Sequence, residues 1–347
     1  MNKDCNKRIV YIDILNIMAI FAVILLHHNG IVHTYSTGRA WKTSLVIETF
    51  FYWAVPVFIM ITGVNLMTYR KKYDTKTFFK KRLTKVLIPF SFWLIFTTIW
   101  KIRTGQLIID NYSIVNILNI IFENKEEPIY YFGFVILGIY ITMPLLSNLT
   151  DYKYRKSIWF TVVLYFIFNS TIPVVFGLFK IKYNTNLSVQ FGSYIVFVLL
   201  GYLLSTEDIS RKKRLIIYFL GIISVLFRYI VTYYLSYKAR YIDKTLFGYY
   251  QFHSVLLAIA VFIFIKNINW DKIIKKDCIK NVLPKITSCS FGIYLTHKII
   301  MYYEIKILDI NILSWQWRTL GAILTYFITL FLVFALKQIP FLKKIVA

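Results

Sequence analysis

Long apolar stretches joined by short polar connections make up most of the 347-residue sequence. Most stretches continue for about 16 to 24 residues without a charge, which suits helices that cross a hydrocarbon core of about 30 Å. A membrane β-barrel would instead alternate apolar and polar residues over segments of about ten residues. The pattern therefore predicts an all-α integral membrane protein of about ten transmembrane helices. The predicted spans are residues 9–28, 45–67, 86–100, 129–147, 158–176, 191–204, 215–236, 246–265, 290–308 and 320–336.

The distribution of Lys and Arg gives these spans an orientation, because cytoplasmic loops carry more of them than external loops do. With the amino terminus inside, 26 Lys and Arg fall in cytoplasmic segments and 11 in external ones. Segment 70–82 alone carries seven. We therefore expect both termini to lie in the cytoplasm. The expected location of the protein is the plasma membrane. No connection is long enough to fold alone, so residues 1–347 are expected to form one transmembrane domain.

Composition supports this interpretation and narrows the partners. Hydrophobic residues make up 58% of the chain and charged residues 16%, too few polar groups to cover a soluble protein of this size. The formal charge of +25 could indicate nucleic-acid binding. The basic residues are confined to connections, however, so we expect membrane lipids and no nucleic acid as partners. Cys5, Cys278 and Cys289 show no metal-ligand spacing, and no metal is expected.

Polar residues in the first span form a stripe along one face. At 100° per residue, Asn16 lies about 20° from His27 in azimuth and Asp13 about 40° from it, whereas His28 is turned about 100° away. An ionisable group inside a span costs about 2.5–3.5 kcal/mol, so the stripe is expected to face protein or a wet cavity. At the outer end of the span, His27 could take the proton of an attacking hydroxyl. The alternative is an interfacial histidine that reaches the headgroups.

A second stripe lies in the ninth predicted span, where Ser290, His297 and Glu304 recur every seven residues and stay within about 40° of one another. Together with the first stripe, these residues indicate a polar cavity that opens outward. The structural alternative for each residue is an ion pair or hydrogen bond that holds helices together.

Three further ionisable residues stand in the outer halves of spans or at their outer ends: Glu48, Arg228 and His253. Arg228 is the most costly of them in lipid and needs a partner. Glu48, Glu304 and Asp13 are its candidate partners. The same two interpretations apply here, a wall of the cavity or contacts that hold helices together.

A basic cluster stands at the expected cytoplasmic entrance to the third span, and it consists of Lys80, Lys81, Arg82 and Lys85. Such a cluster can hold the phosphates of a nucleotide-like donor. Its commoner role is to fix the topology and attract anionic lipid. Charge alone favours the commoner role.

Several short blocks follow one another along the chain. They are RIVYIDILN at 8–16 with His27 beyond it, VPVFIMITG at 55–63, FKKRL at 79–83 with IPF at 88–90, GIY at 138–140 with Pro144, and SFGIYLTH at 290–297. This ordered set resembles the integral-membrane acyltransferase family 3, which includes bacterial O-acetyltransferases of surface polysaccharides. Each block is degenerate alone, and the order of the set makes the resemblance specific.

The resemblance implies a ten-helix fold and transfer of an acyl group, expected to be acetyl, from cytoplasmic acyl-CoA. The acceptor would be a hydroxyl of an envelope or capsular polysaccharide, or of its lipid-linked precursor. In this interpretation the catalytic residues are His27 as general base, with Asp13 and Asn16 orienting groups along the channel. The donor would contact Arg82, Lys85, Thr62 and Tyr294. The acceptor cavity would be shaped by Arg228, Glu304, His297, Glu48 and His253.

One position departs from the family pattern. Family members commonly carry an arginine eleven residues before the histidine, where this chain has Asn16, and an amide hydrogen-bonds without adding charge. This leaves open an altered donor or a non-catalytic member. The rival function is a polysaccharide transporter or export accessory protein, in which His27→Ala would leave an acylated glycan at the surface. A lipid flippase of unrelated fold is a second rival, against which the family blocks argue. The acceptor sugar, acyl chain and oligomeric state are not specified by the sequence.

Overall fold

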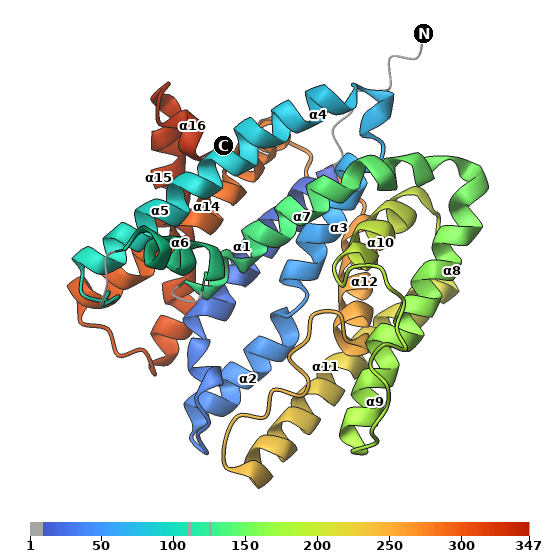
Figure 1. The fold of residues 1–347 in the computed structure, drawn as a ribbon, viewed down its shortest axis with the longest axis horizontal. Coiled ribbons are helices and arrows are strands. Elements are labelled where there is room, and N and C mark those ends of the chain that lie inside the picture. The colour runs from blue at the N-terminus through green and yellow to red at the C-terminus, as the bar shows by residue number, and fades with distance from the viewer. Residues whose placement is uncertain (1–9, 110–112, 125–126, 347) are drawn as a thin grey trace.

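The computed structural model describes residues 10–109, 113–124 and 127–346, and these form helices and loops without a strand (Figure 1). The predicted all-α fold is confirmed. Arg8, in the first family block, lies outside the described residues. The main helices are α1 (Val10–His28), α2 (Arg39–Phe51), α3 (Ala54–Leu66), α4 (Thr75–Arg82), α5 (Ile88–Arg103), α6 (Ile114–Glu123), α7 (Tyr131–Leu146), α8 (Arg155–Tyr165), α9 (Ile172–Leu178), α10 (Ile195–Thr206), α11 (Arg211–Ala239), α12 (Phe252–Lys266), α14 (Asp277–Leu308) and α15 (Ala322–Gln338), with short α13 (Trp270–Ile273) and α16 (Lys343–Val346).

Within the described residues, seven helical stretches are long and apolar enough to cross a membrane. They are Val10–His28, Arg39–Lys71, Thr75–Arg103, Pro128–Thr150, Tyr152–Leu178, Arg211–Ala239 and Trp317–Gln338. The other three predicted spans correspond to α10, α12 and α14. The first two have only 12 and 15 residues, and the 32-residue α14 carries His297 and Lys298 within its apolar part. Length and composition thus support seven of the ten predicted spans.

One predicted span contains a break in its helix, and two predicted boundaries are wrong. The span 45–67 is broken at Tyr52 and Trp53, because Pro56 cannot donate to the carbonyl of Tyr52 and its ring clashes there. The span 246–265 becomes helical only at Phe252. The span 290–308 starts at Asp277, since a helix continues into polar surroundings where hydropathy no longer reports it.

A helix that the apolar pattern did not predict lies in the connection 101–128. This is α6, which begins after Ser113, whose hydroxyl accepts a hydrogen bond from the amide of Asn116 at 3.2 Å. None of its residues is buried, and Ile114 and Phe122 are among its exposed apolar side chains. An amphipathic helix of this kind suits the boundary between lipid and water.

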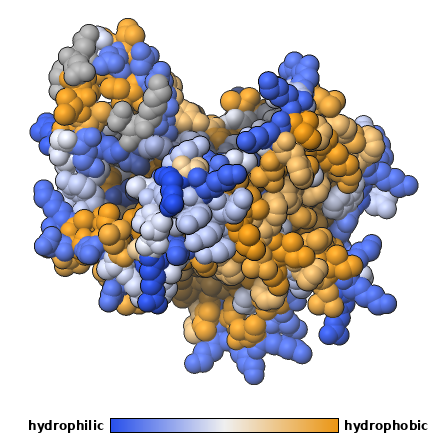
Figure 2. Space-filling model, turned by 90° about the horizontal axis from the view of Figure 1, so that it is seen from below, coloured by the Kyte–Doolittle hydropathy of each residue, from blue (hydrophilic) through white to orange (hydrophobic). Residues whose placement is uncertain are grey.

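Helix α11 buries polar residues and exposes apolar ones, which is the reverse of a surface helix in a soluble protein. Four buried polar residues recur every four positions along one face, namely Ser224, Arg228, Thr232 and Ser236. The opposite face exposes Leu215, Phe219, Ile222, Leu226 and Ile230. Figure 2 shows wide apolar areas on the molecular surface. A surface so apolar is stable in lipid, where polar groups must face the protein interior.

The short helix α10 is enclosed by protein and crosses α3 at very close range. All of its residues from Val196 to Leu204 are buried. A Cβ atom added at Gly63 would lie 2.1 Å from the carbonyl oxygen of Val198, and one at Gly201 would lie 2.0 Å from that of Met60. Small residues at a crossing let two backbones approach in this way. Because α10 is surrounded by other helices, it needs less length and hydrophobicity than a lipid-facing span.

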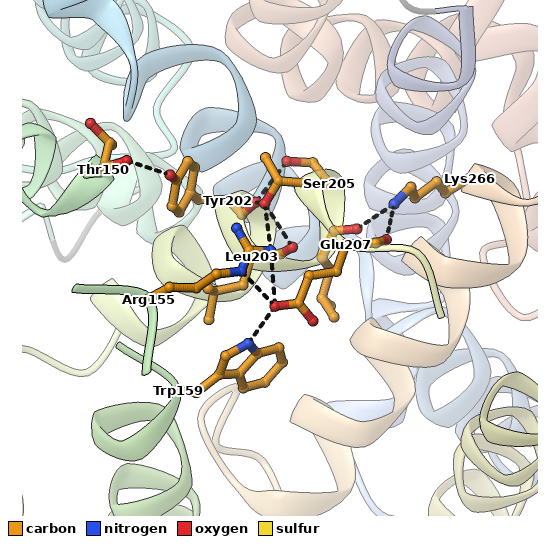
Figure 3. Close-up of polar contacts among 10 residues, drawn as sticks. Thr150, Arg155, Trp159, Tyr202, Leu203, Ser205, Glu207 and Lys266 are labelled. Carbon is orange, nitrogen blue, oxygen red and sulfur yellow. Dashed lines mark hydrogen bonds and ion pairs between the residues drawn. The ribbon is translucent and has the colours of Figure 1, made fainter. Parts of the chain in front are cut away.

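A polar cluster around Glu207 joins the ends of α8, α10 and α12 (Figure 3). One carboxylate oxygen of Glu207 accepts hydrogen bonds from Arg155 Nε at 2.9 Å and from the indole N–H of Trp159 at 2.7 Å. Lys266 Nζ donates to the carbonyl oxygens of Leu204 and Glu207 at 2.7 and 2.6 Å. These charge-assisted bonds fix the helix ends on one side of the molecule.

The crossing of α3 and α10 gives the first prediction. We expect Gly63→Ala and Gly201→Ala each to lower the stability by about 1–3 kcal/mol or more, because the new methyl group meets backbone that cannot move aside. Gly138→Ala is the matched control, since a Cβ atom there has nothing within 4 Å. Melting temperatures in detergent check the prediction. Equal melting of the three variants would show that the backbones do not approach so closely.

Candidate active site

One cavity of about 520 Å³ passes between α1, α3, α7 and α14 and is completed by the loop before α12. Both Asn16 and His27 line it. They stand eleven residues apart on α1, so the cavity extends for about 16 Å along this helix. We call the part lined by Asn16, Arg82 and Lys85 the basic end, and the part lined by His27 and Glu48 the histidine end.

The basic end combines two cations with polar atoms that lack partners. Lys85 and Ser288 both line the cavity, and Lys337 Nζ donates to Ser288 Oγ at 3.2 Å. Among the described residues, Asn16 Oδ1, Arg82 Nε and Ser290 Oγ are buried without a hydrogen-bond partner. Buried polar atoms are rarely left so. The chemistry of this end is therefore suited to a polar, negatively charged group.

A π-helical segment, Leu83–Leu87, joins α4 to α5 beside the basic end. Such segments are rare and frequently occur at functional sites. Arg82 precedes it, with its guanidinium 5.6 Å from the ring centre of Tyr140, and Lys85 lies within it. Both side chains line the cavity, whereas their neighbours Lys80 and Lys81 do not. The structure thus separates two members of the basic cluster from the other two.

The histidine end places the two sequence-predicted histidines in contact. His27 Nδ1 lies 2.7 Å from His297 Nε2, and His297 is fully buried behind His27. His27 lines the cavity, and its Nε2 has no hydrogen-bond partner among the described residues. The imidazole of His27 is therefore open to a molecule in the cavity. The ring of His28 does not line the cavity and forms hydrogen bonds with Trp317 O at 3.0 Å and Thr325 Oγ1 at 2.9 Å.

A buried ion pair supports the wall of the histidine end. Arg228 Nη2 lies 3.4 Å from Glu48 Oε1, and both side chains are almost fully buried. The guanidinium also stands 3.5 Å from the ring centre of Tyr52, which stacks on Tyr249 with ring centres 4.3 Å apart. Of the three candidate partners for Arg228, the structure selects Glu48. Glu48 lines the cavity, whereas Arg228 does not line it and contacts Glu48 from the protein interior.

Five predicted site residues do not line the cavity: His297 and Arg228 contact His27 and Glu48 from the protein interior, and Glu304, His253 and Asp13 lie elsewhere. Glu304 accepts a hydrogen bond from Thr325 and so faces α15. The reason is that a seven-residue repeat drifts about 20° per heptad on a straight helix, so Ser290 reaches the cavity, His297 reaches α1 and Glu304 is turned further. His253 bonds Gln251 at 3.0 Å at the start of α12. Asp13 is buried away from the cavity surface.

The remaining predicted donor residues do line the cavity, although their hydroxyl groups are engaged elsewhere. Thr62 donates to Phe58 O at 3.1 Å, and Tyr294 donates to Ile129 O at 2.7 Å. Each therefore presents its carbon atoms more than its hydroxyl group to the cavity. Tyr294 also bridges α14 to the segment before α7.

Sequence reasoning missed the aromatic lining of the cavity. This lining includes Tyr52, Phe58, Tyr131, Phe132, Phe247 and Tyr249. Aromatic residues make up 19% of the chain, so no single one was distinctive. Two of them, Phe247 and Tyr249, lie in the loop that was predicted to be helical. Their position could not be read from hydropathy.

Helices with apolar outer faces, a polar interior and a long internal cavity are the features of a multi-pass membrane protein with an internal cavity lined by polar groups. A family model described as "Acyltransferase domain" matches residues 9–338, nearly the whole chain. The chain therefore belongs to acyltransferase family 3 and is an acyltransferase. No match was found among curated proteins or among solved structures.

The buried ion pair gives the second prediction. Glu48→Gln leaves the charge of Arg228 buried without a counter-charge, and we expect a loss of about 3–5 kcal/mol in stability. The double variant Glu48→Gln, Arg228→Met should recover part of it, since the uncompensated charge is gone. Asp271→Asn is the control, because Asp271 forms an exposed pair with Lys280. Thermal unfolding in detergent decides, and a Glu48→Gln variant as stable as the control would contradict the pair.

Proposed function

We propose that this acyltransferase carries an acyl group, expected to be acetyl, from cytoplasmic acyl-CoA to a hydroxyl of an envelope or capsular polysaccharide or its lipid-linked precursor. The single observation that supports it is the continuity of the cavity, which is lined by Arg82 and Lys85 at its basic end and by His27 about 16 Å along α1 from Asn16. A donor with phosphates at one end and a thioester on a long flexible arm suits that separation.

The basic end suits the donor nucleotide. Arg82 and Lys85 supply charge for phosphate groups, and Arg82 can offer its unpartnered Nε. Asn16 and Ser290 add neutral hydrogen-bonding groups in the same part of the cavity. Asn16 stands where related proteins carry arginine, so charge recognition falls to α4 and the π-helical segment. Thr62 and Tyr294 line the path of the arm.

The histidine end suits the chemistry. The acceptor oxygen forms a bond to the acyl carbon while Nε2 of His27 takes the hydroxyl proton. The carbon–sulfur bond then breaks, and the same proton passes from His27 to the departing thiolate. Glu48 and the aromatic side chains form the wall against which a sugar ring would rest. No metal is required for this step.

The direction of transfer follows from the membrane orientation, which we propose from the charge distribution. Ten spans and two cytoplasmic termini would place the basic end toward the cytoplasm, where acyl-CoA is made, and the histidine end toward the outside. The spans beyond the seven long ones would be α10, α12 and α14, of which α10 and α12 are short and largely buried in protein and α14 lines the cavity. The plasma membrane is the expected location.

His27→Ala tests the enzymatic role. We expect the ester-linked acyl groups to disappear from the surface glycan of a deletion strain complemented with this variant, while the glycan is still displayed. With purified protein, kcat should fall by about 10²- to 10⁴-fold, the contribution typical of a positioned general base. The measurement is glycan analysis beside wild-type complementation, with equal membrane levels and melting temperatures as the control.

Two other results point elsewhere. Loss of the glycan itself, with the variant folded and present, would favour the export function. A glycan that stays fully acylated with His27→Ala would exclude this histidine as the base.

Arg82→Gln tests the donor end. Loss of a charge-assisted bond to phosphate, worth about 1.5–3 kcal/mol, should raise KM for acyl-CoA about 10- to 100-fold with a smaller effect on kcat. Lys80→Gln is the matched control, because Lys80 belongs to the same cluster but does not line the cavity. Steady-state kinetics with the protein in nanodiscs give both constants. An equal change in KM for the two variants would assign the cluster to topology or lipid attraction.

A further inference from the structure

The two histidines at the histidine end meet edge to edge. Their ring planes differ by 9° and their ring centres lie 4.9 Å apart, while His27 Nδ1 and His297 Nε2 are separated by 2.7 Å. These two distances agree if both nitrogen atoms lie on the line that connects the ring centres. A nearly coplanar arrangement of this kind is the geometry of an aligned N–H···N hydrogen bond.

The backbone of α14 determines which nitrogen of His297 carries the proton. His297 Nδ1 lies 2.8 Å from the carbonyl oxygen of Tyr294 and 3.1 Å from that of Ile293. A carbonyl oxygen only accepts, so Nδ1 of His297 must be the N–H donor. In a neutral ring the other nitrogen, Nε2, is then an acceptor.

His297 is expected to be neutral at this position. Its side chain is fully buried, and a buried imidazolium needs a nearby counter-charge. Among the described residues, the ring of His297 contacts His27 and two backbone carbonyl groups, and no carboxylate forms an ion pair with it. A positive charge on His297 would therefore be buried without a counter-charge.

The proton position on His297 determines the proton position on His27. Since Nε2 of His297 accepts, Nδ1 of His27 must donate. The remaining nitrogen of His27, Nε2, then carries a lone pair and belongs to the ring that lines the cavity. A general base needs this form, because the alternative tautomer would present an N–H to the acceptor hydroxyl.

We propose that His297 is a positioning residue that holds His27 in the Nδ1–H tautomer and so keeps Nε2 available as the base. This proposal rests on the function proposed above. During the reaction His27 gains and then loses one proton at Nε2, and His297 keeps its single proton throughout. When His27 is positively charged, its Nδ1–H bond to His297 becomes a charge-assisted bond that stabilises the imidazolium.

A matched pair of substitutions separates this role from a purely structural one. His297→Asn places an amide where Nδ1 stands, so it can still donate to the carbonyl groups of α14 but no longer reaches His27. His297→Gln places an amide oxygen where Nε2 stands, so it can still accept from His27. We expect kcat of His297→Asn to fall about 10- to 100-fold, as is typical when a supporting partner is lost. KM for acyl-CoA should not change, and His297→Gln should keep more of kcat than His297→Asn.

A direct readout does not depend on turnover. The chain has five histidines, so selective ¹⁵N labelling of the imidazoles gives few signals, and the His27→Ala and His297→Asn variants assign the two of interest. The proposal predicts a protonated Nδ1 and an unprotonated Nε2 for His27 in the wild type, and a mixture of tautomers in His297→Asn. A wild-type His27 protonated at Nε2 overturns the proposal, even if both His297 variants fail to fold.

The kinetic outcomes distinguish this proposal from the proposed function. If His27→Ala is inactive while His297→Asn keeps wild-type kcat, only the positioning role is wrong. Equal loss of kcat in His297→Asn and His297→Gln, with unchanged melting temperatures, also overturns it. If His27→Ala itself keeps its activity, the assignment of the base in the proposed function is wrong.

Discussion

The structure depends on one constraint, that a polar group inside a membrane must find its partner within the protein. The polar stripe of α11 is buried while its opposite face is apolar and exposed. The same constraint turns Asn16 and His27 toward a common cavity and places Arg228 against Glu48. Helices that are enclosed by protein, such as α10, or that line the cavity, such as α14, need not resemble lipid-facing spans. The site and the fold therefore have a single physical origin.

Much of the fold could be predicted because hydropathy reports directly on lipid contact. All ten apolar runs are helical to a large extent, and the family resemblance agrees with the match over residues 9–338. The errors lie where other forces decide. Pro56 breaks one run through backbone sterics, and α14 extends to Asp277 because a helix can leave the membrane without ending. The amphipathic α6 carried no long apolar signal.

The candidate site was predictable along a helix but not between helices. Angular position on α1 separated His27 from His28, and in the structure the two rings face different surroundings. The contact between His27 and His297 could not be predicted, because it depends on how α1 packs against α14. The seven-residue stripe on α14 suggested one face, yet its members reach three different environments, with Glu304 turned to α15. Aromatic residues of the cavity gave no signal in a chain so rich in them.

The central claim is that one passage joins a phosphate-binding end to a histidine that performs the transfer. Its most direct test is a cryo-electron-microscopy structure of the protein in nanodiscs with a non-hydrolysable acyl-CoA analogue. The account predicts phosphate density beside Arg82 and Lys85, with the arm passing Thr62 and the thioester analogue ending at Nε2 of His27. Phosphate density outside this cavity, or an arm that ends away from His27, would contradict it.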